Sequence, residues 1–136
     1  MNWKRYLIAS VVAMIVITIV EMIGHGYFMT PYYRETEALW RTLEAMNKLL
    51  WLGYLATIAT SLIFVYIYHK GYEGKGPGAL EGLRFGIIVG IFMAVPMSAW
   101  TYASQPITVA VAIGWFLITL TKFTLAGLGV GLVYTK

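Results

Sequence analysis

The chain has 136 residues and a formal net charge of +4, and 60% of its residues are apolar while only 12% are charged. Soluble domains carry about 45–50% apolar and about 25% charged residues, so a single water-soluble core could not bury this much apolar surface. The chain contains no cysteine, which excludes a disulfide framework, a thiolate metal site and a cysteine nucleophile. Its positive residues lie mostly between apolar runs, which indicates membrane topology and not nucleic-acid binding.

Four apolar runs predict four membrane-spanning helices, at about residues 6–29, 49–68, 80–103 and 107–134. Each run reaches the roughly 20 residues that a helix needs to cross the bilayer core. The first run is longer than the apolar core of a signal peptide and lacks a small-residue cleavage site, so we expect a retained helix. The sequence therefore predicts one all-α domain over residues 1–136, a polytopic membrane protein folded as a four-transmembrane-helix bundle.

The only sizeable polar segment, residues 30–48, separates the first two runs. Apolar residues recur in and after it at helical spacing: Leu39, Leu43, Met46 and Leu50. Two Glu-to-cation pairs stand four residues apart in the favourable order: Glu37 with Arg41, and Glu44 with Lys48. The pattern predicts an amphipathic helix, either lying in the membrane interface or serving as a solvated connector, that can continue into the second span.

Small residues recur every four positions in the third and fourth runs. They are Gly82, Gly86, Gly90 and Ala94 in the third run, and Gly127 and Gly131 in the fourth. Small residues in this register let helix backbones approach closely in lipid. We therefore expect these glycines to form contact surfaces between helices.

The lysines and arginines between the apolar runs and near their ends predict the orientation in the membrane. Six fall on one side: Lys4, Arg5, Lys70, Lys75, Arg84 and Lys136. Three fall on the other: Arg34, Arg41 and Lys48. By the positive-inside rule, both termini are expected in the cytoplasm and the protein in the cytoplasmic (inner) membrane.

Two ionisable residues interrupt the apolar runs, Glu21 in the first and Lys122 in the fourth. An ion at membrane depth has to find a partner or lose its charge, so both mark a candidate site. Helical rise places them about 9 Å apart in depth, and a flexible lysine on a helix tilted by about 20° can close much of that gap. Thr18, His25 and Phe28 share a helical face with Glu21.

We therefore predict an intramembrane polar network that fixes the register of the helices. Its members are Thr18, Glu21, His25, Thr119 and Lys122. Three alternatives remain open. Glu21 can be a proton or ligand site, the two side chains can extend until their charged ends reach the membrane–water interface, or they can pair with another protein chain.

No cofactor is expected from the residue pattern. His25 and His69 lie at opposite ends of their spans and cannot share one haem or metal ion. Glu21 and His25, four residues apart, can supply half of a metal site, but the sequence does not indicate the other half. A single axial His25 on a haem or pigment remains an alternative.

No catalytic arrangement is visible, so we do not expect an enzyme. The glycine-rich stretch 69–78 predicts a flexible turn, and it lacks the strand and the GK[ST] sequence of a phosphate loop. The serines are scattered without a paired base: Ser10, Ser61, Ser98 and Ser104.

Three short stretches carry a resemblance. The sequences GYEGKG at 71–76, EGLRFG at 81–86 followed by Gly90, and YASQPI at 102–107 resemble a pattern in small four-span bacterial membrane proteins of unknown function. This resemblance implies a four-span fold and no particular activity. The size and Glu21 are also similar to the small multidrug resistance transporters, which have four spans and an essential glutamate in the first. The sequence IVEMI around Glu21, Lys122 and the long polar segment depart from that family's pattern.

The glycine-lined spans and scarce polar groups predict a helix-packing accessory or interaction subunit of a membrane complex or homo-oligomer. Its expected partners are the lipid bilayer and other membrane helices, and not nucleic acid. The alternative is a small proton-coupled transporter that uses Glu21. An accessory subunit requires the polar groups to be satisfied inside the bundle or against a partner, whereas a transporter requires a water-filled cavity that reaches Glu21.

Overall fold

The computed structural model describes residues 2–134, which form seven helical segments and no strand. The long helices are α1 (Trp3–Ile23), α3 (Leu43–Gly71), α4 (Gly78–Ser104) and α5 (Val109–Val133). The short ones are the π-helix η1 (Gly24–Phe28), α2 (Thr30–Glu35) and the 3-10 helix η2 (Glu37–Leu39). Within these residues four helices, the first counted with η1, are long and apolar enough to cross a membrane, in agreement with the four predicted runs.

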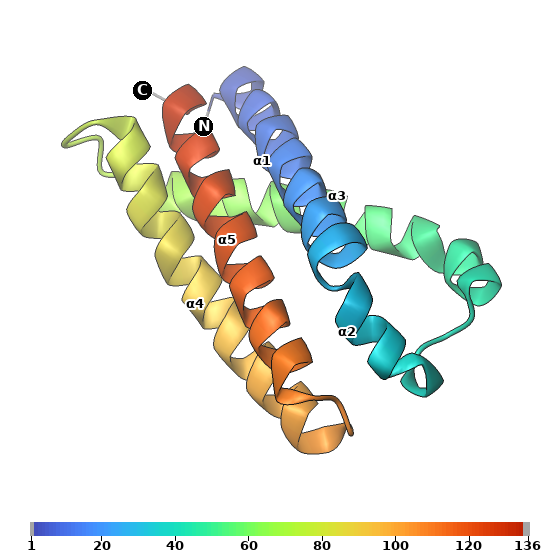
Figure 1. Cartoon of the computed structure of the whole chain (residues 1–136). Helices are drawn as coiled ribbons and strands as arrows, with labels where there is room; N and C mark the ends of the chain where they lie inside the picture. The colour runs from blue at the N-terminus through green and yellow to red at the C-terminus, as the bar shows by residue number, and fades with distance from the viewer. Residues whose placement is uncertain (1, 135–136) are drawn as a thin grey trace.

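The long helices converge at one end of the molecule. Helices α4 and α5 run side by side, α1 lies along the other side of α5, and α3 crosses behind them (Figure 1). Phe64 of α3 packs against Phe85 of α4 and Phe123 of α5, with ring centroids 4.8 and 5.5 Å apart. We call this the closed end; its buried rings are Tyr6, Phe64, Tyr68, Phe123 and Tyr134.

At the other end, α3 stands away from the remaining helices. No residue of its first half, residues 43–60, is buried, and Figure 1 shows this half extending beyond the other helices. The buried residues of α3 all belong to its second half, from Ser61 onward. We call this the open end. All four long helices therefore pack together only at the closed end.

Helices α4 and α5 touch backbone to backbone along the predicted glycine positions. A Cβ atom added to Gly127 would lie 2.7 Å from the Cα atom of Gly86, and one added to Gly86 would lie 2.9 Å from the Cα atom of Thr124. Gly82 meets Gly131 in the same way, at 2.8 Å. No real side chain has contacts this short with a backbone, so only glycine allows this approach.

The polar segment between the first two spans differs from its prediction. Residues 30–48 form α2, η2 and the first turns of α3 instead of one continuous helix. The break occurs at Thr36, whose hydroxyl donates to the Tyr32 carbonyl at 3.0 Å and accepts from the Trp40 indole N–H at 2.9 Å. These side-chain bonds compete with a regular helix. The location of this segment at a membrane interface stays a prediction.

Helix α3 is longer than predicted, whereas the other spans agree with their predicted bounds to within three residues. It begins six residues before residue 49 because the Thr42 side chain caps it by accepting from the Ala45 N–H at 3.3 Å. It continues to Gly71, so the first three residues of the predicted turn are helical. The remaining turn is tied down by Glu81, whose carboxylate accepts from the N–H groups of Glu73 and Gly74 at 2.6 and 3.3 Å.

The glycine contact leads to a prediction for α5. Gly127→Ala should lower the thermal stability of the protein in detergent, at a cost of about 1–3 kcal/mol, because the new methyl group meets the backbone of α4. Gly129→Ala is a matched control two residues away, since its Cβ would meet side chains and no backbone: Val12 at 3.0 Å and Val16 at 3.8 Å. Both variants gain the same helix propensity, so equal melting temperatures would contradict the close contact.

Candidate functional site

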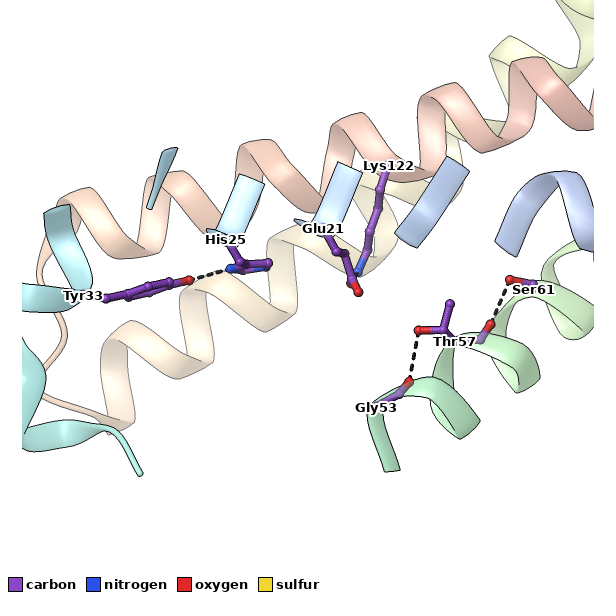
Figure 2. A network of polar contacts seen from close by, with 7 residues as sticks. All are labelled: Glu21, His25, Tyr33, Gly53, Thr57, Ser61 and Lys122. Carbon is purple, nitrogen blue, oxygen red and sulfur yellow. Dashed lines mark hydrogen bonds and ion pairs between the residues drawn. The ribbon is translucent and has the colours of Figure 1, made fainter. Parts of the chain in front are cut away.

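The structure brings Glu21 of α1 and Lys122 of α5 together as an ion pair. The side chain of Lys122 is 16% exposed and that of Glu21 is 36% exposed, so the lysine lies deeper between the helices. Figure 2 shows both side chains pointing toward the side where α3 carries Thr57 and Ser61. Within the described residues, the part of α3 before Ser61 contributes no buried side chain to this side of the pair.

A second polar cluster lies one helical turn further toward the open end. The Trp115 indole N–H donates to the Tyr33 hydroxyl oxygen at 2.7 Å, and this oxygen lies 2.5 Å from His25 Nδ1. An indole nitrogen can only donate, so the Tyr33 oxygen accepts from Trp115, and we assign the proton of the Tyr33 hydroxyl to the bond with His25 Nδ1. The neutral His25 ring then carries its proton on Nε2.

The protonation state of Tyr33 supports this assignment. Burial raises the pKa of the Tyr33 hydroxyl above its ordinary value of 10.0, and the bond from Trp115 offsets only part of this rise. The hydroxyl is therefore protonated at neutral pH and can donate to His25. Figure 2 shows His25 between Tyr33 and the Glu21–Lys122 pair, so the polar groups follow one another along the molecule.

The π-helix η1 positions His25. Met29 N–H donates to the Gly24 carbonyl at 2.9 Å, which widens the turn by one residue relative to an α-helix. Gly24 permits close packing on α5, because a Cβ there would lie 2.7 Å from a side-chain carbon of Ile118. The wider turn also separates Phe28 from His25: Phe28 lines a groove with Val20 and Ile118 and not the surroundings of His25. The face predicted to be shared by His25 and Phe28 falls on this widened turn, where the prediction assumed a regular α-helix.

A cavity of about 520 Å³ opens beside His25 at the open end. Its lining residues, which we call the aromatic pocket, are His25, Tyr33, Leu39, Trp40, Arg41, Met46 and Trp115. Trp40 packs against two of these rings, with centroid distances of 5.3 Å to Tyr33 and 5.9 Å to Trp115. Sequence reasoning missed this pocket because its walls come from η1, α2, η2, the η2–α3 connection, the start of α3 and α5, which no local pattern links.

The two threonines predicted for the polar network lie elsewhere. Thr119 is buried at 4% exposure, and Thr18 lines a groove of about 310 Å³ between α1 and α3 together with Thr57. Among the interactions described for residues 2–134, no hydrogen bond joins either threonine to Glu21 or Lys122. The structure thus contains two clusters, the ion pair and the His25–Tyr33–Trp115 group, where one network was predicted.

The two histidines are separated as the topology required. His69 lies at the closed end, where its Nδ1 atom is 2.6 Å from the Tyr134 hydroxyl. Within the described part of the chain, no group of three histidine or acidic side chains is arranged to hold a metal ion. The predicted packing glycines belong to the α4–α5 contact, including Gly90, whose Cβ would lie 3.0 Å from the Leu120 side chain.

Comparisons of this chain with protein-family models, with curated proteins and with solved structures find no match. The function therefore has to be inferred from the chemistry of the two clusters and from the packing of the helices. The ion pair can fix helix register or exchange a proton, and the aromatic pocket can hold a small molecule.

The ion pair generates a double-mutant prediction. Glu21→Gln and Lys122→Met should each destabilise the protein by about 1–3 kcal/mol, because each leaves the partner charge poorly solvated between helices. The double variant should recover part of the combined loss, as thermal unfolding of all four proteins in one detergent will measure. Strictly additive losses would mean that the two charges are not coupled.

Proposed function

We propose that this chain is a multi-pass membrane protein that serves as a helix-packing subunit and assembles with a second copy of itself. The observation that carries the proposal is the open end, where the first half of α3 has no buried residue and Glu21 keeps 36% exposure. Exposed apolar side chains are well solvated by lipid. A charged pair and a row of small residues that face the same gap are poorly solvated by lipid, and they favour contact with another helix.

The row of small residues lies on α3. Gly53, Thr57 and Ser61 follow each other at four-residue spacing, and Figure 2 shows them on the side of the Glu21–Lys122 pair. Ser61 is buried at 1% exposure, whereas a Cβ on Gly53 would meet nothing within 4 Å. The row is therefore packed at one end and unoccupied at the other. The hydroxyls of Thr57 and Ser61 bond to carbonyls of their own helix, so the face can accept a neighbour without leaving them unpaired.

A second copy fits this face because the face is self-complementary. Small-residue rows let two identical helices cross closely about a two-fold axis, so that Gly53 of each copy faces the other. The incoming α3 would also cover the exposed side of Glu21 in its partner. One symmetric contact would thus cover both the unoccupied end of the small-residue row and the exposed side of Glu21.

Disulfide cross-linking tests this assembly directly, because the chain has no cysteine of its own. Leu49→Cys lies one turn before Gly53 on the small-residue face and should form a covalent dimer when membranes are oxidised. Leu55→Cys is the matched control on the opposite side of α3, with 55% exposure. It should stay monomeric.

Two results would contradict the second copy as the partner. The first is a single chain in lipid nanodiscs at all protein concentrations, measured by mass photometry or native mass spectrometry. The second is stoichiometric cross-linking of Leu49→Cys to a different membrane protein, which would leave the helix-packing role in place and change its partner.

A small proton-coupled transporter is the second candidate, and the exposure of the Glu21 carboxylate toward the open end favours it. In that case Glu21→Gln would abolish pH-driven uptake into liposomes while leaving thermal stability near that of the wild type. If the protein has the packing role, Glu21→Gln should instead lower thermal stability and dimer formation, and no proton-dependent flux should be measured for the wild type.

The charge distribution supports a cytoplasmic location for both termini. The resemblance of stretches 71–76, 81–86 and 102–107 to small bacterial membrane proteins supports the inner membrane of a bacterium as the location. Reporter fusions after Lys136, which lies outside the described residues, and in the turn after Gly71 should therefore both give cytoplasmic signals. A fusion within residues 34–41 should give the opposite signal. An extracytoplasmic signal from either of the first two fusions would overturn this orientation.

A further inference from the structure

We propose that the aromatic pocket binds a ring-bearing amphiphile whose head carries a neutral hydrogen-bond acceptor, the chemistry of a membrane quinone. The cavity of about 520 Å³ falls within the range of about 300–1,000 Å³ that is typical of small-molecule sites. It lies where η1 gives way to α2, at the end of the first span. A lipid-soluble ligand can reach this position from the bilayer.

The hydrogen-bond donor of the proposed site is His25 Nε2. The Tyr33 hydroxyl lies 2.5 Å from Nδ1, and in the assignment given above it donates its proton to this nitrogen while it accepts from Trp115. The remaining ring proton is therefore on Nε2, for which no partner is described within residues 2–134. His25 is half-buried and lines the cavity, so a ligand that supplies an acceptor there, such as a carbonyl oxygen, can take this proton.

The walls of the pocket select a flat and mostly apolar body. Tyr33, Trp40 and Trp115 present three rings, and the Trp40 and Trp115 planes are inclined by 46° with centroids 5.9 Å apart. Aromatic side chains in such offset and tilted arrangements pack favourably on a further ring. Leu39 and Met46 complete an apolar lining.

The charges near the pocket argue against a cationic ligand, although aromatic walls often hold one. No lining residue is acidic, and Arg41 adds a positive charge to the lining. The nearest carboxylate along α1, Glu21, is already paired with Lys122. Acceptor groups on the ligand are therefore favoured over amines.

Isothermal titration calorimetry of the whole protein in detergent tests the proposal, with titration into empty micelles as the reference. The probe is a decyl-substituted benzoquinone. Decylbenzene has the same tail and a ring without acceptors, and decanoate has the same tail with a carboxylate. We expect the quinone to bind and decylbenzene to bind about 2- to 10-fold more weakly, the effect of one hydrogen bond.

Three variants connect binding to the pocket. His25→Phe keeps a ring and removes the Nε2 donor, so it should weaken quinone binding about 2- to 10-fold and leave decylbenzene unaffected. Trp40→Leu removes a wall that belongs to a connecting segment and not to a long helix, so folding should persist while both probes bind more weakly. Trp51→Leu is the matched control, since Trp51 is 61% exposed on α3 and lies outside the pocket.

Several outcomes would overturn the proposal. Equal binding of decylbenzene and the quinone would mean that the pocket recognises apolar bulk alone. Unchanged quinone affinity in Trp40→Leu would move binding away from the pocket. Tighter binding of decanoate than of the quinone would make this an anion site governed by Arg41. None of these results depends on whether two copies assemble through α3.

Discussion

The backbone contact between α4 and α5 is the constraint on which the rest of the molecule depends. Gly82 and Gly86 face Gly127 and Gly131 so closely that the two helices have a single relative position. Helix α5 then becomes a fixed support for the remaining structure. It presents Phe123 to the ring cluster of the closed end, Lys122 to α1, and Trp115 to the aromatic pocket.

The two ends of the molecule are stabilised by different physical effects. At the closed end, tightly packed aromatic rings from α3, α4 and α5 form a core in which α3 is held by its second half. At the open end, two polar contacts link α1 and α2 to α5: the Glu21–Lys122 pair and the bond from Trp115 to Tyr33. Within residues 2–134, no contact of this kind is described for the first half of α3; this half contains no buried residue, and Glu21 stays more exposed than Lys122.

The π-helix η1 relates these polar contacts to each other. A regular helix through residues 24–28 would have kept Phe28 on the same face as Glu21 and His25. The wider turn instead separates Phe28 from His25 and leaves His25 within reach of the Tyr33 hydroxyl. Such turns within helices are frequent at functional sites, and here the turn supports both the packing role and the ligand site proposed above.

The sequence by itself determined the helical class, the four long apolar helices and the identity of the residues that need partners. Apolar length and helical periodicity are local properties, so they are readable without a fold. Tertiary structure alone decided the rest: the wide turn at Gly24, the break at Thr36, the divergence of α3 and the pocket formed by Tyr33, Trp40 and Trp115. Each of these depends on side chains far apart in the chain or on competition between local hydrogen bonds. A helical pattern states which residues share a face, but the angle at which two helices cross is set only when their surfaces meet.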